Sequence, residues 1–286
     1  MPMPKRSNLK GPGRCIFCGS YGLTKEHIWP QWSFKYVPKG PNTTHVRGLV
    51  QSSKGSPRIK GVRRIKQHNG PVNTIQLRVV CRTRCNSGWM SILETRAKPI
   101  LIPLMLGEPL VLAPENQRTL ARWFTLKVMV AEFSEPEALA TQQSERDHLM
   151  FKDEPPSNWQ IWIGHKRGPD WRVKYTRSAM TLGIAMDDGP LIPPDGDYAK
   201  NAKAVTMGIG ELLLYAVATP PGIGVRFDGN LTEPLRRIWP TSGGIVWPPG
   251  KILTDRDCNV VASSLDRFSE TLPWQPAPES ASAIER

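Results

Sequence analysis

The sequence predicts an α+β fold built from two parts, and three observations lead to this prediction. Four of the five cysteines fall within residues 15–97 of the 286-residue chain. An apolar stripe at helical spacing runs from Glu115 to Phe133. Beyond residue 158, short alternating and apolar runs are typical of strands. The predicted parts are a basic arm at 1–14, a cysteine-rich module at 15–97, a mixed α+β domain at 98–274 and a disordered tail at 275–286.

One strand and one helix are predicted inside the cysteine-rich module. Thr74–Val80 alternates between apolar and polar residues, as a half-buried strand does. A helix is expected to begin near Asn86 and to end before Pro99, because proline lacks the N–H that continues a helical ladder. Residues 37–72 are rich in glycine, proline, serine and basic residues. They are predicted to form a long basic loop, with a short strand at Ile59–Ile65.

The second part is predicted to begin with helices and to continue with strands. The strongest helix pattern is the stripe from Glu115 to Phe133, which follows Pro114. A more polar helix is expected near Glu137–Met150. Alternating or apolar runs then predict strands at Trp159–Gly164, Arg172–Tyr175, Met180–Met186 and Leu212–Val217.

Positive charge is concentrated at one end of the chain. The net charge is +13, but residues 1–93 hold seventeen lysines and arginines and a single acid, Glu26. The remainder holds twenty-one basic residues and twenty-four acids. Such a one-sided segment favours binding to a polyanion such as nucleic acid. The alternative is a basic surface or arm that is simply solvated.

The sequence shows neither a membrane span nor a secretory signal. No run of eighteen apolar residues occurs, so no spanning helix is expected. The segment Met1–Lys10 is polar and basic and lacks the apolar stretch of a signal peptide. We therefore expect a cytoplasmic protein of a bacterial or viral-type intracellular setting, with no membrane partner.

The cysteines form two closely spaced pairs. Cys15 and Cys18 enclose two residues and are followed by Gly19, and Cys81 and Cys85 enclose three. Such spacing suits a closed, tetrahedral, structural zinc site of four thiolates. Disulfides are the alternative, although a chain without a secretory signal disfavours them. Unrelated buried cysteines are a third interpretation, and that is how Cys258 is interpreted.

A candidate catalytic pair lies between the two cysteine pairs. Glu26, the only acid of the basic segment, directly precedes His27. A neutral imidazole near pH 7 can take a proton from water. A carboxylate is a ligand for a hard divalent cation that stabilises charge on a phosphate. His27 has two other interpretations, as a zinc ligand in place of a cysteine or as an ordinary residue at the start of a helix.

The order of these motifs resembles the HNH endonuclease family. Cys15-x-x-Cys18 comes first, then Glu26-His27 with a proline three residues later, and then Cys85-Asn86-Ser87-Gly88-Trp89-Met90 with Glu94 after it. The resemblance covers about residues 15–97. It implies a zinc-stapled ββα-metal fold for this segment, in the subset of the family that carries four zinc-binding cysteines.

The resemblance also implies roles for individual residues. His27 matches the general base, and Glu26 and Asn86 match ligands of a catalytic divalent metal such as Mg²⁺. The middle asparagine of the family motif has Asn73 as its best candidate here and Asn69 as its second. The cysteines would hold structural Zn²⁺.

The expected function is metal-dependent hydrolysis of phosphodiester bonds, with double-stranded DNA as the favoured partner. Two other classes are weighed against it, a zinc-stabilised nucleic-acid-binding protein without catalysis and an interaction protein with a solvated basic region. Aromatic residues near His27 can stack on bases or fill the core, and the core interpretation is favoured. The densest basic run, which is the candidate phosphate-binding segment, consists of Arg58, Lys60, Arg63, Arg64 and Lys66.

Overall fold

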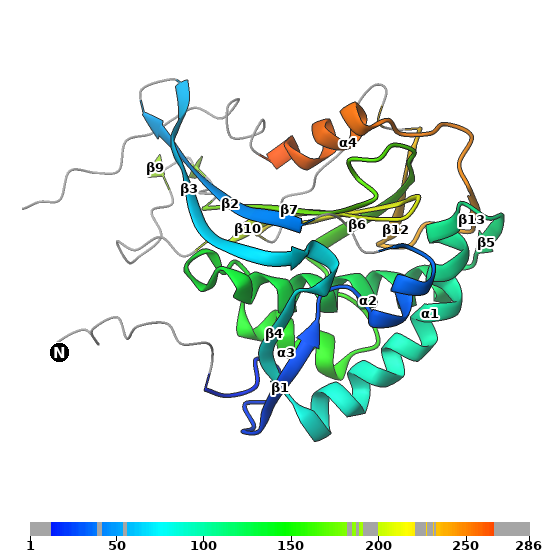
Figure 1. The fold of residues 1–286 in the computed structure, drawn as a ribbon, viewed down its shortest axis with the longest axis horizontal. Helices are drawn as coiled ribbons and strands as arrows, with labels where there is room; N and C mark the ends of the chain where they lie inside the picture. Colours follow the sequence, from blue (N-terminus) through cyan, green and yellow to red (C-terminus); the bar gives the residue numbers. More distant parts are fainter. Residues whose placement is uncertain are drawn as a thin grey trace, which may run out of the picture.

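A computed structural model gives the fold of the protein (Figure 1). It describes residues 13–38, 42–53, 56–181, 185–186, 189–190, 200–220, 227, 231 and 233–265. Between residues 42 and 69 the description covers the backbone only. The predicted tail at 275–286 and residues 1–12 of the predicted arm lie outside the described residues.

The first part consists of two antiparallel strands followed by a helix (Figure 1). Strands β1 and β4 pair, so that Glu26 lies opposite Leu77 and His27 opposite Gln76. β4 confirms the strand predicted from alternation, whereas β1 was not predicted. The bounds are β1 (Leu23–His27), β4 (Gln76–Cys81), the kinked helix η3 (Arg82–Met90) and its continuation α1 (Ser91–Leu106).

The segment predicted as a long loop is a hairpin instead. β2 (Asn42–Ser53) and β3 (Ser56–Pro71) pair along their length, between the short helices η1 (Gln31–Lys35) and η2 (Val72–Thr74). The strand expected at Ile59–Ile65 is part of β3. Glycine and proline hide the alternation that marks a strand, and the ladder accommodates this composition with three shifts of register.

The helix after the second cysteine pair is longer than predicted. It begins at Arg82 and continues through Pro99 and Pro103 to Leu106, and Gly107 caps it in the left-handed conformation. Proline removes a helical hydrogen bond, and Pro99 lies on the exposed face of the helix. Water can reach the carbonyl that this leaves free, and the opposite face is buried. Tertiary packing therefore overrides the local signal to stop.

The second part contains a five-stranded antiparallel sheet in the order β12-β6-β11-β10-β7. Helix α2 lies on one face of the sheet and α4 on the other (Figure 1). Successive residues of β11 alternate between the two cores, with Leu212 and Leu214 on the α2 side and Leu213 and Tyr215 on the α4 side. The bounds are β6 (Trp159–His165), β7 (Val173–Met180), β10 (Ala202–Ile209), β11 (Leu212–Ala218), β12 (Leu235–Trp239) and α4 (Asp255–Ala262).

Strands β6, β7 and β11 match predicted strands, and β10 and β12 were not predicted. β10 carries Lys203 and Thr206 at fully buried positions, so its sequence lacks the apolar signal of a core strand. The remaining strands are short: β5 (Leu110–Leu112), β8 (Ala185–Met186), β9 (Gly189–Pro190) and β13 (Ile245–Trp247).

Helix α2 (Pro114–Ala131) confirms the strongest helix prediction, but it is buried almost all round and not along one stripe. Even Lys127 in its last two turns is 2% exposed. The more polar helix begins later than expected, as α3 (Gln143–Phe151), after the short turns η4 (Glu132–Ser134) and η5 (Pro136–Ala138). None of the described helices is long and apolar enough to span a membrane.

The two predicted parts share one hydrophobic core. Phe17, Trp29 and Val80 from the first part join Trp123 and Ile161 from the second in the same buried cluster. Helix α1 runs without interruption across the expected boundary at residue 97. The packing therefore places side chains of α2 directly beneath β1.

Candidate active site and metal centre

The four cysteines of the first part converge on one point. Their sulfur atoms all lie within 4.8 Å of one another, with Cys15 Sγ 3.6 Å from Cys85 Sγ and Cys18 Sγ 3.4 Å from Cys81 Sγ. The first pair sits in a tight turn that Gly19 closes at a φ of 69°, and the N–H of Gly19 donates to the carbonyl of Cys15. The second pair joins the end of β4 to the first turn of η3.

This arrangement can hold a structural metal ion such as zinc. All five cysteines are free, so the disulfide alternative is wrong. Tetrahedral zinc with thiolates at about 2.3 Å places neighbouring sulfur atoms about 3.8 Å apart, close to the separations found here. The hydrogen-bonded contact with Cys85 holds the pKa of Cys15 well below its usual range, and the same contact raises the pKa of Cys85. His27 is not a member of the cluster.

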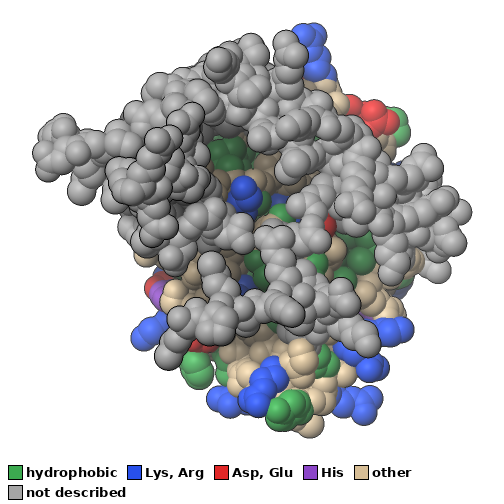
Figure 2. All heavy atoms as spheres, turned by 90° about the vertical axis from the view of Figure 1, so that its left-hand side faces the viewer, with side chains coloured by type: hydrophobic (Ala, Val, Ile, Leu, Met, Phe, Trp, Pro, Cys, Tyr) green, Lys and Arg blue, Asp and Glu red, His purple; other side chains and the backbone are tan. Residues whose placement is uncertain are grey.

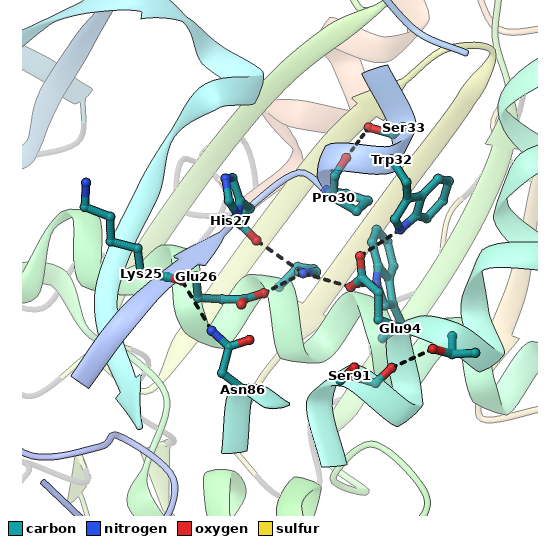
Figure 3. Close-up of polar contacts among 12 residues, drawn as sticks. Lys25, Glu26, His27, Pro30, Trp32, Ser33, Asn86, Ser91 and Glu94 are labelled. Carbon is teal, nitrogen blue, oxygen red and sulfur yellow. Dashed lines mark hydrogen bonds and ion pairs between the residues drawn. The ribbon is translucent and has the colours of Figure 1, made fainter. Parts of the chain in front are cut away.

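Strand β1 presents its functional residues on two faces. Lys25 and His27 project from one face and Glu26 from the other, as Figure 3 shows. His27 Nε2 lies 2.5 Å from the side-chain nitrogen of Gln76, its cross-strand partner. Partial burial lowers the pKa of His27 below its ordinary value. The imidazole is therefore neutral near pH 7. Because His27 is the last residue of β1, the interpretation of His27 as the start of a helix is wrong.

Glu26 is held by a buried lysine from α2. Lys127 Nζ lies 2.8 Å from Glu26 Oε1 and 3.1 Å from Glu94 Oε2. It also donates to the carbonyl of His27 at 3.2 Å. Burial disfavours the charged amine, but the two carboxylates outweigh it and raise the pKa of Lys127. Lys127 is therefore a fixed positive charge between Glu26 and Glu94.

Glu94 is the second carboxylate of the site. The indole N–H of Trp32 donates to Glu94 Oε1 at 2.9 Å, and that of Trp123 to Glu94 Oε2 at 3.1 Å. Burial opposes ionisation, but the charge of Lys127 and these hydrogen bonds lower the pKa of Glu94. Figure 3 shows the resulting row of contacts from Glu26 to Trp32. Trp32 and Trp123 are thus polar partners of Glu94 as well as packing residues.

These groups line one pocket of about 480 Å³. Asn86 reaches it from η3, where its side-chain amide donates to the carbonyl of Lys25 at 3.3 Å. The pocket therefore lies where β1, η1, the kinked helix and α2 meet. Its lining residues are Glu26, His27, Pro30, Gln31, Trp32, Asn86, Ser87, Met90, Ser91, Glu94, Thr95 and Lys127.

The other predicted site residues lie elsewhere. Asn73 is 2% exposed within η2 and does not line the pocket. The basic run Arg58, Lys60, Arg63, Arg64 and Lys66 falls on β3, where the side chains lie outside the described residues.

Sequence reasoning missed Lys127, and it noted Glu94 without giving it a role. Lys127 follows Trp123 by four residues on α2, so one face of this helix carries both of the α2 side chains that contact Glu94. This spacing from Trp123 is the sequence signal that could have marked Lys127, a charged residue within the apolar stripe, as a site residue. Nothing local connects it with Glu26, which is about a hundred residues away.

Basic side chains surround the cysteine end of the molecule. Lys and Arg side chains gather along the lower edge of the surface in Figure 2, the end at which β1 and β4 lie in Figure 1. Lys25 and Arg78 are both exposed and directly opposite each other in the β1–β4 register. Like charges at such a position are destabilising. Arg14, Arg82 and Arg84 are also exposed here.

No protein-family model, no curated protein and no solved structure matches the chain.

Proposed function

We propose that the protein is a metal-dependent, HNH-like endonuclease that hydrolyses DNA phosphodiester bonds in the pocket of Glu26, His27 and Asn86. The observation that carries the proposal is that these three residues, each chosen from the sequence alone, line a single pocket. That pocket lies beside a four-cysteine cluster, on two antiparallel strands followed by a helix. This order of elements agrees with the ββα arrangement that the family resemblance implies.

The donor set of the pocket suits a hard divalent cation. Glu26 uses Oε1 for Lys127, and its other carboxylate oxygen makes no hydrogen bond among the described residues. Asn86 donates through its side-chain nitrogen, so its carbonyl oxygen is available as a ligand. Oxygen ligands of this kind are those that Mg²⁺ prefers. When bound, the cation would stabilise negative charge on the phosphate and on the leaving oxygen.

His27 is suited to remove a proton from water. Its lowered pKa keeps the ring neutral near pH 7, and a neutral ring offers one nitrogen as acceptor. The cross-strand Gln76 contacts Nε2 and fixes the orientation of the ring. For Nε2 to accept a proton from water, the amide of Gln76 has to yield its place.

Lys127 and Glu94 would act as positioning residues. Lys127 fixes one oxygen of Glu26, while Glu94 with its two indole donors keeps Lys127 in place. With two carboxylates and one ammonium, the row keeps one net negative charge. A divalent cation is therefore attracted to it, although the ammonium reduces the attraction.

The exposed charges support a polyanionic substrate. Lys25 and Arg78 face the same side of the β1–β4 pair as His27. A phosphate backbone on this side would relieve their mutual repulsion. Because affinity for nucleic acid grows with the number of phosphates neutralised, the same surface supplies both binding and placement of the substrate beside His27.

A non-catalytic, zinc-stabilised nucleic-acid-binding protein is the second candidate. The observation that favours it is that Glu26 already has a cationic partner in Lys127, and His27 already has a partner in Gln76. In such a protein both contacts would be purely structural.

A plasmid-nicking assay separates the two candidates. Wild type and His27→Ala would be compared with Mg²⁺, Mn²⁺ or EDTA, with His148→Ala on α3 as a matched control. Loss of a general base reduces the rate by about 100- to 10,000-fold. We expect metal-dependent nicking that His27→Ala loses and His148→Ala keeps. Salt-sensitive DNA binding without nicking in any metal would contradict the endonuclease and support the second candidate.

A further inference from the structure

A second pocket lies at the other end of α1 and carries a different charge. It has a volume of about 510 Å³ and opens where the turn between β10 and β11 meets the end of α1. Three cations and one acid line it. The lining includes Tyr36, Met105, Lys166, Arg167, Arg172 and Glu211.

Lys166 forms the floor of this pocket. It is 1% exposed, and its Nζ donates to the carbonyl of Gly210 at 2.6 Å. An ammonium has three N–H donors, and this is the only bond it makes among the described residues. Burial lowers the pKa of Lys166 to about 8. A buried ammonium of this kind gains most from an anion that restores the solvation it has lost.

The turn that positions Lys166 requires a glycine. Gly210 has a φ of +61°, and a Cβ at this position would lie 2.3 Å from the carbonyl oxygen of Met105. The same oxygen accepts the N–H of Glu211 at 2.8 Å. The carbonyl of Met105, near the end of α1, is thus already hydrogen-bonded to the turn. It does not compete for the ammonium group of Lys166.

The rim of the pocket is positively charged overall. Arg167 and Arg172 are exposed there. The single acid, Glu211, is engaged by His165 at 2.7 Å and by Arg167 at 3.6 Å. Asp255 on α4 lies against Gly168, another lining residue, and its carboxylate accepts hydrogen bonds from the backbone N–H groups of Asp170 and Trp171. The residues that line the pocket therefore carry more positive than negative charge, with three cations against the one acid.

We infer that this second pocket binds a phosphate group, and specifically a backbone phosphate of the nucleic acid that occupies the first pocket. The second half of this inference rests on the proposed function. Helices η1 and α1 connect the two pockets: Trp32 and Glu94 line the first, and Tyr36 and Met105 line the second. At 1.5 Å per residue, Glu94 and Met105 lie about 16 Å apart along α1. Phosphates of one DNA strand advance about 3.4 Å per nucleotide along the duplex, so the pockets would bind phosphates about five nucleotides apart.

Pyrophosphate binding tests the pocket without any need for cleavage. Titration calorimetry would compare wild type with the rim variant Arg167→Gln/Arg172→Gln. The control Arg118→Gln/Arg237→Gln removes the same charge at exposed positions away from both pockets. We expect wild type and control to bind, and the rim variant to lose at least about tenfold in affinity, since it lacks two charge-assisted hydrogen bonds. Lys166→Met should lose a similar amount of affinity for pyrophosphate. If the Lys166→Met variant does not fold, the rim variant still tests the pocket. No binding by wild type, or equal affinities of rim variant and control, would overturn the inference.

A DNA arm then identifies the source of the phosphate. Affinity for a twelve-base-pair DNA duplex would be measured against salt, and the log–log slope flattens by about 0.9 for each phosphate that is no longer neutralised. A flatter slope in the rim variant than in the control supports a backbone phosphate. If pyrophosphate binding weakens but the slope equals that of the control, the backbone assignment is wrong and the site takes a free phosphate. Neither the pyrophosphate measurement nor the DNA-binding measurement depends on nicking. Both can therefore be interpreted even if the first pocket has no nuclease activity.

Discussion

Lys127 joins two carboxylates that are far apart in the sequence, because its Nζ lies 2.8 Å from Glu26 Oε1 and 3.1 Å from Glu94 Oε2. The lysine comes from the most deeply buried helix of the fold, and its side chain is 2% exposed. This contact connects α2 with β1 and α1. It makes the charge state of the candidate active site depend on the packing of the whole chain.

Replacing Lys127 with methionine should be strongly destabilising. Methionine fills much of the same volume, but Glu26 and Glu94 lose the charge between them. Removing one partner of a buried ion pair costs about 3 to 5 kcal/mol. Chemical denaturation would measure the free energy of unfolding, with Lys152→Met on the surface as control. Adding Glu26→Gln to Lys127→Met should recover part of the loss, and a double variant as unstable as the single one would count against the coupling.

The stability contributed by Glu94 should depend on pH. Its pKa is lowered in the folded state from the ordinary value of 4.5. A lowered carboxyl pKa gives stability that is present above pH 4.5 and disappears as the pH falls through the folded-state pKa. The difference in unfolding free energy between wild type and Glu94→Gln should thus be full at pH 6 and shrink below pH 4.5. A difference that stays constant down to pH 3 would show that Glu94 acts only through its shape.

Removal of the cysteine cluster should unfold the first part of the chain. We expect about one zinc ion per molecule, which a four-thiolate site binds, and its loss in Cys81→Ser. Because metal binding contributes directly to folding, chelation should lower Tm. Zinc content by plasma emission spectroscopy and Tm by calorimetry would be measured together. Cys258→Ala is the matched control, since Cys258 is buried away from the cluster, and equal zinc content in both variants would contradict the assignment.

Neutralising the basic run of β3 should weaken DNA binding without base specificity. Replacing Arg58, Lys60, Arg63, Arg64 and Lys66 with glutamine should flatten the salt dependence on duplex DNA, by about 0.9 in log–log slope for each phosphate that these residues neutralise in wild type. Filter binding at several salt concentrations would measure it. A slope equal to that of wild type would show that the hairpin does not bind the phosphates.

The exposed pair Lys25 and Arg78 provides a second, independent test of DNA binding. Lys25→Gln/Arg78→Gln removes two like charges that face each other across β1 and β4. We expect this variant to bind DNA more weakly and to be slightly more stable than wild type, by about 0.2 to 1 kcal/mol, because cross-strand repulsion is relieved. Thermal unfolding in the absence of DNA measures the predicted gain in stability. A loss of stability would show that the two charges do not repel each other appreciably in the free protein.

The elements that local patterns reveal were predictable. The stripe of α2, the alternation of β4 and the apolar run of β11 each lie within one short window of sequence, because side-chain patterning is a local property. Of the β2–β3 hairpin only the short strand at Ile59–Ile65 was predicted, since glycines and prolines mask the alternation in the rest. The end of α1 was also misplaced, because the packing of Ile100, Leu101 and Leu104 outweighs two prolines.

Residue types and their spacing along the chain were enough to reveal the chemistry available to this protein: a metal-binding cysteine quartet, a Glu-His pair, an asparagine after the last cysteine and a basic first third. These are local motifs, and each can be recognised without knowledge of the fold. Packing alone brings Lys127 and Glu94 into the site of Glu26, and places Lys166 at the floor of a second, positively charged pocket. The physical reason is that burial of a charged side chain is tolerated only where an opposite charge or a hydrogen-bond acceptor meets it. Such partners come together through the tertiary structure and not through proximity in the sequence.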